Sequence, residues 1–179
     1  LLQTPTTRLK DDTLERARHR NKKRGDLAER VATLTASGMW HRAIQHQSHL
    51  VAMTESDFGP MHLNVARECL CLGHMFMRMG KLDRAEKAIL RTIGICEIGK
   101  GEVHGENNVE IGQYCLEAMH YLALVSDVMG GEKIARGLSL HEECLRRVNG
   151  DAFAAWRPRI RKALELHHEA HSSKESSEA

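Results

Sequence analysis

The segment GMWHRAIQHQSHLVAMTESDFGPMH (38–62) recurs as GKLDRAEKAILRTIGICEIGKGEVH (80–104). The opening glycine, the Arg-Ala pair and the closing histidine of the first copy all reappear 42 positions later. A weaker third copy starts at Gly130-Gly131, and its alanine, Ala135, lies 50 positions after Ala85. A repeat period of about 20–50 residues is typical of chains built from stacked structural units. The sequence therefore predicts a repeat architecture.

Each unit has the apolar pattern of two amphipathic helices joined by a turn. In the second unit, apolar residues recur at spacings of three and four on both sides of Gly80, so each set shares one helical face. They are Val65, Cys69, Leu72, Phe76 and Met79 before the turn, and Leu82, Ala85, Ala88, Ile89, Ile93 and Cys96 after it. Gly80 suits a left-handed turn, and Ala85 is small enough for the two helices to approach closely. Because no stretch alternates with a period of two, we predict an all-α fold of antiparallel helical hairpins, stacked as a short α-solenoid with a C-terminal capping helix.

Three motifs carry a resemblance to a known family. Leu72-Gly73-His74-Met75-Phe76 is similar to the first helix of a tetratricopeptide repeat (TPR), and Gly80-Lys81-Leu82-Asp83-Arg84-Ala85-Glu86 is similar to its turn and second helix. Phe58-Gly59-Pro60-Met61-His62 resembles the linker of the longer repeats found in kinesin light chains. The resemblance spans roughly Leu27 to Val148. It implies a TPR-like solenoid that binds other proteins.

The same resemblance implies a partner-binding groove on the first helix of each unit. The implied positions are Arg67, Leu70, His74, Met77 and Arg78 in the second unit, and Glu117, His120, Leu124 and Asp127 in the third. The first unit offers mainly a shallow, uncharged stretch, namely Ala28, Ala32, Thr35 and Ala36. Such a groove fits an extended segment or helix of mixed character rather than a strongly acidic peptide.

The N-terminal residues 1–24 form a basic arm, with eight lysines and arginines against three acidic residues, although the whole chain carries a formal charge of only +2. We expect its cations to make the contacts, in particular Arg16, Arg18, Arg20, Lys22, Lys23 and Arg24. RNA phosphate, anionic lipid headgroups and an acidic protein surface are all candidate targets, and a solvated, charge-rich helix is the alternative. Aromatic residues make up 4% of the chain and none lies in the arm, which argues against stacking on single-stranded RNA.

The chain divides into this arm (1–24), a helical-repeat domain with its capping helix (25–171) and a tail without apolar residues (172–179) that we expect to be disordered. Trp156, Ile160 and Leu164 are spaced by four and predict the packing stripe of the capping helix. A second basic cluster stands at the start of that helix, formed by Arg157, Arg159, Arg161 and Lys162.

The histidines and cysteines give no metal or catalytic motif. His167 and His171 are one helical turn apart and could share a metal, but we interpret them as decoration of the solvated end of the last helix and predict no metal site. His62 and His104 occupy equivalent linker positions, where a turn-stabilising role is expected. The five cysteines form no CxxC pair and fall mostly on apolar stripes, which indicates buried thiols in a reducing, intracellular compartment.

No nucleotide-binding, metalloprotease or hydrolase motif is present, so we predict neither an enzyme nor a cofactor. No apolar run approaches the roughly 18–20 residues of a membrane span. The leading hypothesis is a non-catalytic protein–protein interaction scaffold, an accessory subunit of a larger multiprotein complex. A first residue other than Met, the basic balance and the free thiols favour the mitochondrion over the cytosol. The alternative is an RNA-associated protein of a ribonucleoprotein, which would contact phosphate through the basic arm.

Overall fold

The computed structural model describes residues 5–102, 107–148 and 151–175, and within them every regular element is helical. The elements are α1 (Pro5–Ala36), α2 (Trp40–Phe58), α3 (Leu63–Arg78), α4 (Leu82–Glu102), α5 (Asn107–Met129), α6 (Lys133–Arg147), a 3₁₀ turn η1 (Asp151–Trp156) and α7 (Arg157–Glu175). The predicted all-α fold is confirmed. None of the helices in the described part of the chain is both long enough and apolar enough to cross a membrane.

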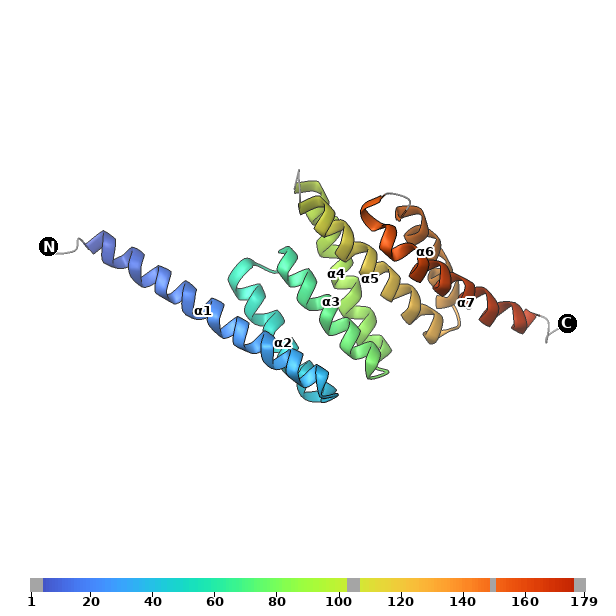
Figure 1. The fold of residues 1–179 in the computed structure, drawn as a ribbon, viewed down its shortest axis with the longest axis horizontal. Coiled ribbons are helices and arrows are strands. Elements are labelled where there is room, and N and C mark those ends of the chain that lie inside the picture. The colour runs from blue at the N-terminus through green and yellow to red at the C-terminus, as the bar shows by residue number, and fades with distance from the viewer. Residues whose placement is uncertain (1–4, 103–106, 149–150, 176–179) are drawn as a thin grey trace.

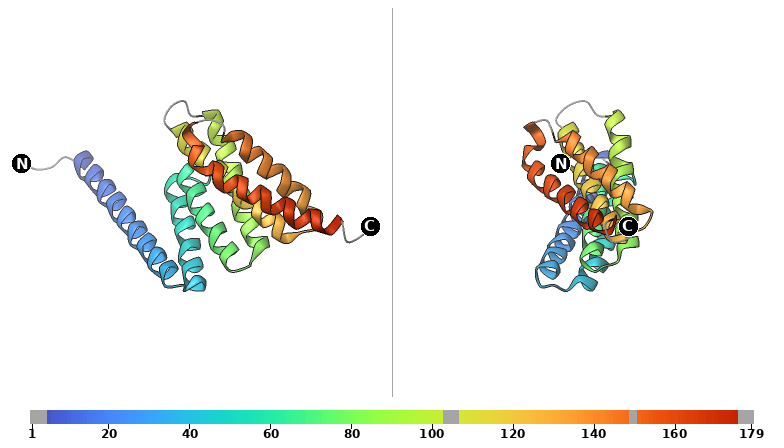
Figure 2. Two further views of the ribbon diagram at one scale, coloured as in Figure 1. Left: turned by 45° about the vertical axis from the view of Figure 1, so that its right-hand side comes forward. Right: turned by 90° about the vertical axis from the view of Figure 1, so that its right-hand side faces the viewer.

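The helices form three antiparallel hairpins, α1–α2, α3–α4 and α5–α6, each packed against the next. Helices α3 and α5 also contact one another, as do α5 and α7. Figure 1 looks onto the face where α1, α3, α5 and α7 follow one another across the molecule, with α4 and α6 behind them. The two views of Figure 2 show the same stacking from other sides. The architecture is the predicted α-solenoid.

Glycines with a left-handed backbone end the first helix of each hairpin. Gly80 has a φ of 67°, and the equivalent residue of the first unit, Gly38, has a φ of 70°. Residues with a Cβ rarely adopt this conformation, so glycine is favoured there. The prediction for Gly80 is confirmed.

His62 has the expected structural role at the start of α3. Its Nδ1 accepts a hydrogen bond from the backbone N–H of Asn64 (3.1 Å) and so caps the helix. His104, the equivalent residue of the second unit, lies outside the described residues.

Helices α3 and α4 approach closely because small residues face each other between them. Ala85 has no exposed surface, and a Cβ built on Gly73 would lie 2.7 Å from Cγ1 of Ile89. Ile89 is itself fully buried and belongs to a cluster with Phe76 and Leu122, which joins the second hairpin to the third. The sequence-based prediction that Ala85 allows a close approach is consistent with this packing.

An ion-pair network links consecutive hairpins on the α4–α6 side. The Glu86 carboxylate of α4 accepts hydrogen bonds from Lys133 Nζ (2.6 Å) and Arg136 Nη2 (2.5 Å) of α6. Burial acts to raise the pKa of Glu86, but hydrogen bonds and charges from these two cations outweigh it and hold that pKa below the ordinary value. The carboxylate is therefore kept ionised by the neighbouring repeat.

Helix α7 caps the last hairpin. Ile160 is fully buried against the core of the second and third hairpins, and Trp156 packs beside it. The Arg157 guanidinium donates a hydrogen bond to the Val148 carbonyl at the end of α6 (2.8 Å). This bond holds the first residue of α7 next to the end of α6. Residues 172–175, which the sequence analysis assigned to a disordered tail, continue α7 as helix, and residues 176–179 lie outside the described part.

Candidate partner-binding cleft

The predicted groove positions of α3 divide into an exposed group and a buried residue. Arg67, His74 and Arg78 are exposed and Met77 is half-buried. Leu70 retains only 4% of its surface, because it packs into the core that joins α3 to α4 and α5. Leu70 therefore supports the helix packing, and the other four residues form the accessible face of α3.

The accessible faces of α3 and α5 are continuous. The imidazole of His74 stacks on the ring of Tyr121, with 5.4 Å between centroids. Burial, followed by the charge and hydrogen bond of Glu117, raises the pKa of Tyr121 to about 12, so its hydroxyl stays protonated at neutral pH. The exposed part of α3 thus leads directly onto the face of α5 that carries the remaining predicted positions.

The two arginines of α3 have different surroundings. Arg67 forms an ion pair with the neighbouring carboxylate of Glu68 (2.8 Å), which is 6% exposed and also accepts a hydrogen bond from Gln47 (2.9 Å). Arg78 lies over the ring of Trp40, 5.6 Å from its centroid. Arg67 therefore balances a buried carboxylate, whereas Arg78 has no ion pair among the described residues and leaves its charge available to a ligand.

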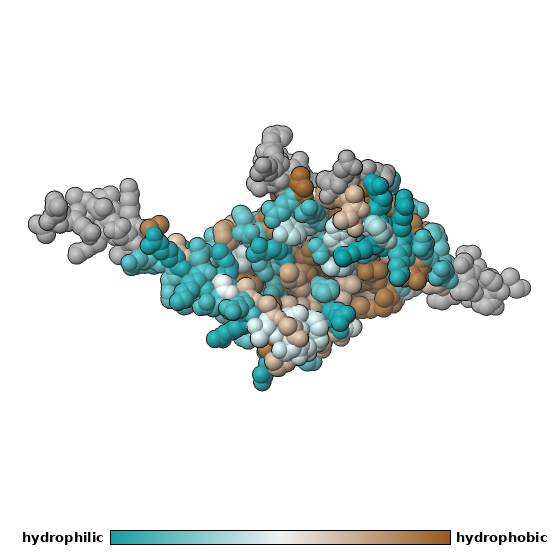
Figure 3. Space-filling model, viewed as in Figure 1, coloured by the Kyte–Doolittle hydropathy of each residue, from teal (hydrophilic) through white to brown (hydrophobic). Residues whose placement is uncertain are grey.

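A cleft of about 840 Å³ lies between α5 and α7. Its lining combines apolar, cationic and imidazole groups, and comprises His120, Leu124, Asp127, Val128, Arg159, Lys162, Ala163, Leu166, His167, Ala170 and His171. Val128 is 71% exposed and Leu166 54% exposed, which is unusual for aliphatic side chains gathered at one place. Figure 3 shows hydrophobic residues gathered on the viewed face over α5 and α7.

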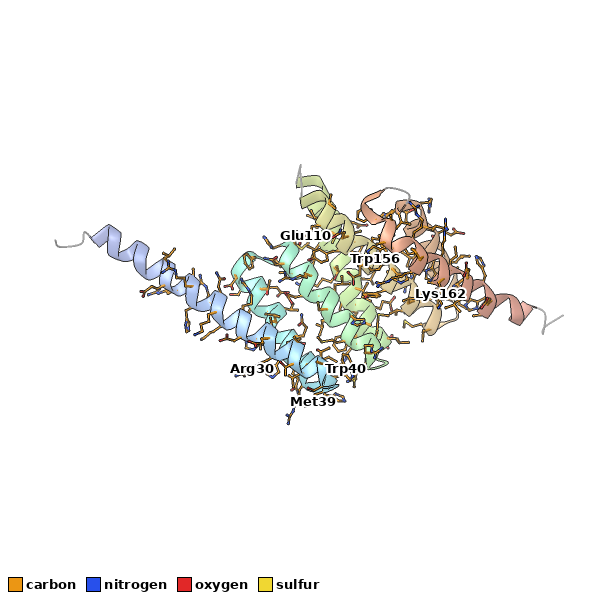
Figure 4. All side chains as sticks on the ribbon, viewed as in Figure 1. Arg30, Met39, Trp40, Glu110, Trp156 and Lys162 are labelled. Atoms are coloured by element: carbon orange, nitrogen blue, oxygen red, sulfur yellow. The ribbon has the colours of Figure 1, made fainter. Side chains whose placement is uncertain are left out.

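Cations border this cleft on α7. Arg159 lies over the ring of Trp156 (5.5 Å from the centroid), and Lys162 is exposed one turn further along the helix; Figure 4 labels Trp156 and Lys162. His120 remains neutral, because burial lowers its pKa to about 4, with the nearby His141 and Arg159 acting in the same direction. The accessible charge at the cleft is therefore positive.

Asp127, the acidic residue in the lining of this cleft, contacts two histidines. Its Oδ2 lies 2.7 Å from Nε2 of His141, and its Oδ1 lies 2.8 Å from Nδ1 of His167. The interpretation of His167 as a solvated residue is wrong: it is 5% exposed, because α7 crosses α5 and α6 and brings it onto Asp127. His141, which the sequence analysis did not single out, is fully buried.

The structure thus brings together three of the four predicted third-unit positions, His120, Leu124 and Asp127, and leaves Glu117 beside Tyr121. It adds Val128, Arg159 and Leu166, which the sequence analysis did not assign to the groove. Arg159, Lys162, Leu166 and Ala170 follow each other at helical spacings of three and four, and Ala163 lies on the same face, four residues after Arg159. That stripe is visible in the sequence and could have identified the second wall of the cleft.

Solved structures of repeat proteins are similar to the stacked helical hairpins of this chain. A structure described as a putative kinesin light chain with nearly identical TPR-like repeats, from Podosopora anserina, is similar with a TM-score of 0.62 and 14% identity, over 87% of this chain and 70% of that one. A substituted form of the same protein gives a TM-score of 0.63 and 15% identity, over 87% and 69% of the two chains. This chain has a TPR-like fold. No protein-family model matches its sequence, and no curated protein matches it.

The N-terminal arm of this TPR-like chain is continuous with its first repeat helix. Helix α1 runs unbroken through the predicted boundary at residue 24, and its N-terminal part extends away from the stacked hairpins (Figure 1). Arg24 donates to Asp57 at the end of α2 (2.9 Å) and lies over the ring of Phe58, and Arg20 also pairs with Asp57 (3.3 Å). Four of the six named arm cations are exposed and have no ion pair or cation–π contact with any residue that the structure describes, namely Arg16, Arg18, Lys22 and Lys23.

Proposed function

We propose that this chain is a non-catalytic scaffold that binds a segment of another protein in the α5–α7 cleft. The observation that carries the proposal is the exposure of Val128 on α5 and Leu166 on α7, which both line one cleft. Apolar side chains gathered at an accessible hollow lose surface to water when a partner covers them, and this burial stabilises association. The TPR-like fold supports the same function, since stacked hairpins present extended binding surfaces without chemistry of their own.

The chemistry of the cleft defines the segment that fits it. Leu124, Val128 and Leu166 give the cleft an apolar lining that fits aliphatic or aromatic side chains. Arg159 and Lys162 stand at its border, so a carboxylate on the partner next to its apolar residues would be attracted and oriented there. Because Asp127 is already occupied by two imidazoles, the cleft favours a partner that is apolar and acidic, a narrower class than the mixed segment expected from sequence.

The accessible face of α3 would extend this contact. His74, Met77 and Arg78 continue from the cleft along the His74–Tyr121 stack, so a segment longer than the cleft has a polar and cationic path to follow. The exposed cations of α1 would provide a separate contact with an acidic surface of the same assembly. In this proposal the chain is an accessory subunit of a larger complex, and the mitochondrion is the first compartment in which to look for it.

Co-purification with matched variants tests the proposal. The tagged full-length chain is compared with a Val128→Asp, Leu166→Asp double variant and with Leu90→Asp, which alters a 45% exposed leucine on α4 away from the cleft. We expect proteins recovered with the parent and with Leu90→Asp to be lost from the double variant. Equal recovery with all three chains, after circular dichroism has shown that each is folded, would exclude the cleft as the binding site.

A further inference from the structure

Three potential metal ligands converge where α5, α6 and α7 meet. Asp127 comes from α5, His141 from α6 and His167 from α7, and one ligand atom of each lies within 4.8 Å of the others. They are far apart in the sequence, since His167 comes 40 positions after Asp127. We propose that Asp127, His141 and His167 bind a divalent transition-metal ion of the zinc class, with His171 as the fourth ligand.

The donor set and spacing fit such an ion. Zinc takes imidazole nitrogen and carboxylate oxygen at about 2.0–2.2 Å in tetrahedral geometry, which puts neighbouring ligand atoms roughly 3.3–3.6 Å apart. His141 Nε2 lies 2.7 Å from Oδ2 of Asp127, and His167 Nδ1 lies 2.8 Å from the other oxygen, Oδ1. When one ligand atom is taken from each residue, the three atoms all lie within 4.8 Å of one another. Small side-chain rotations would therefore be sufficient to surround an ion. The ring of His171 lies one turn after His167, with 4.7 Å between the two centroids, and could supply the fourth nitrogen.

The surroundings provide both space and access. A Cβ on Gly137 would lie 2.1 Å from Oδ1 of Asp127, so the carboxylate occupies space that only a glycine at this place in α6 leaves open. Glycine is unfavourable inside a helix, and here its absence of a side chain positions a ligand. His167 and His171 also line the α5–α7 cleft, through which an ion can enter.

Two ring tautomers of His141 fit its surroundings, one for hydrogen bonding and one for metal binding. Its Nδ1 is buried and has no hydrogen-bond partner among the described residues. When Nε2 donates to Asp127 the ring proton is on Nε2, and when Nε2 binds a cation the proton can reside on Nδ1. The exchange moves one proton between two nitrogens of the same ring, and an imidazole ligates metals through the nitrogen that carries no proton.

Zinc binding to the full-length chain, stripped of metal with a chelator, tests the site. Titration calorimetry should find one Zn²⁺ per chain, and Asp127→Asn and His171→Gln should each weaken its affinity by at least about tenfold. His49→Gln removes an exposed histidine of α2 and should leave the affinity unchanged. Gly137→Ala should weaken binding by displacing Asp127, whereas Gly94→Ala, in α4 with no atom within 4 Å of the added Cβ, should not.

A second measurement separates a metal site from a hydrogen-bonded cluster. Co²⁺ bound to the parent should give the visible absorption bands of tetrahedral coordination, and the bands should be absent from Asp127→Asn. If Asp127→Asn fails to fold, the partly exposed His171→Gln decides the outcome. Absence of Zn²⁺ binding by the parent, or equal loss of affinity in His49→Gln and His171→Gln, would overturn the proposal.

Discussion

Replacing Gly73 by alanine should destabilise the protein, although alanine is the better helix former. Gly73 lies inside α3, where it faces α4. The added Cβ would be 2.7 Å from Cγ1 of Ile89 and 3.6 Å from both the Ala85 carbonyl oxygen and the Ala88 Cβ. Since Cγ1 of Ile89 is close to its own backbone and the side chain is fully buried, it cannot move aside freely.

Two opposing contributions, helix propensity and overpacking, decide how much the free energy of unfolding changes. Alanine is favoured over glycine in a helix interior by about 1 kcal/mol. Overpacking a filled core costs about 1–3 kcal/mol, and a contact of 2.7 Å belongs in the upper half of that range. The free energy of unfolding should therefore fall by about 1–2 kcal/mol, which lowers Tm by roughly 2–8 °C for a chain of this size.

The assay is thermal and urea-induced unfolding followed by circular dichroism, with Gly94→Ala as the matched control. Gly94 also lies inside a helix, but no atom is within 4 Å of the Cβ position, so only the propensity gain remains. We expect Gly94→Ala to raise the free energy of unfolding by up to about 1 kcal/mol. If Gly73→Ala is as stable as Gly94→Ala, the close α3–α4 contact described above does not exist.

Further substitutions test the turn, the helix faces and the inter-repeat network. Gly80→Val should cost more than about 1 kcal/mol, because a β-branched residue is strained at a φ of 67°; a urea midpoint equal to that of the parent would refute the left-handed turn. Ala85→Leu should lower Tm by overpacking while the exposed Arg84→Leu leaves it unchanged, and the reverse order would mean that the faces of α4 are misassigned. The pKa of Glu86 is lower in the folded chain than its ordinary value of 4.5. The ionised Glu86 carboxylate therefore stabilises the fold above pH 4.5, and this contribution is lost as the pH falls through the folded pKa. Urea unfolding at a series of pH values should show a smaller loss of stability at acid pH for Glu86→Gln than for the parent, and identical pH profiles would contradict this.

The parts of the fold that depend on local sequence could be predicted. The spacing of apolar residues fixes which face of each helix is buried, and Gly80 and His62 act within their own turns, so no distant contact had to be known. The recurrence of the same residue types 42 positions later then indicated that the hairpins repeat. These predictions rest on interactions between residues that are close together in the chain.

The parts that depend on how distant segments meet could not be predicted. His167 is buried only because α7 returns over α5 and α6, and its partner Asp127 lies 40 positions earlier. Leu70 was assigned to the groove from a family pattern, but the packing of α5 on α3 places it in the core. The basic cluster of α7 was noted in sequence, and only the position of the helix shows that Arg159 and Lys162 border a cleft.

Site-specific photo-crosslinking in cells shows whether a partner protein occupies the α5–α7 cleft. A photoreactive amino acid is introduced at Val128, inside the cleft, and in a second chain at Leu90, on α4. We expect light to link a distinct protein to position 128, and the linked peptide to be apolar with acidic residues beside it. Crosslinking that is absent at position 128, or equal at positions 128 and 90, would mean that no partner protein occupies the cleft.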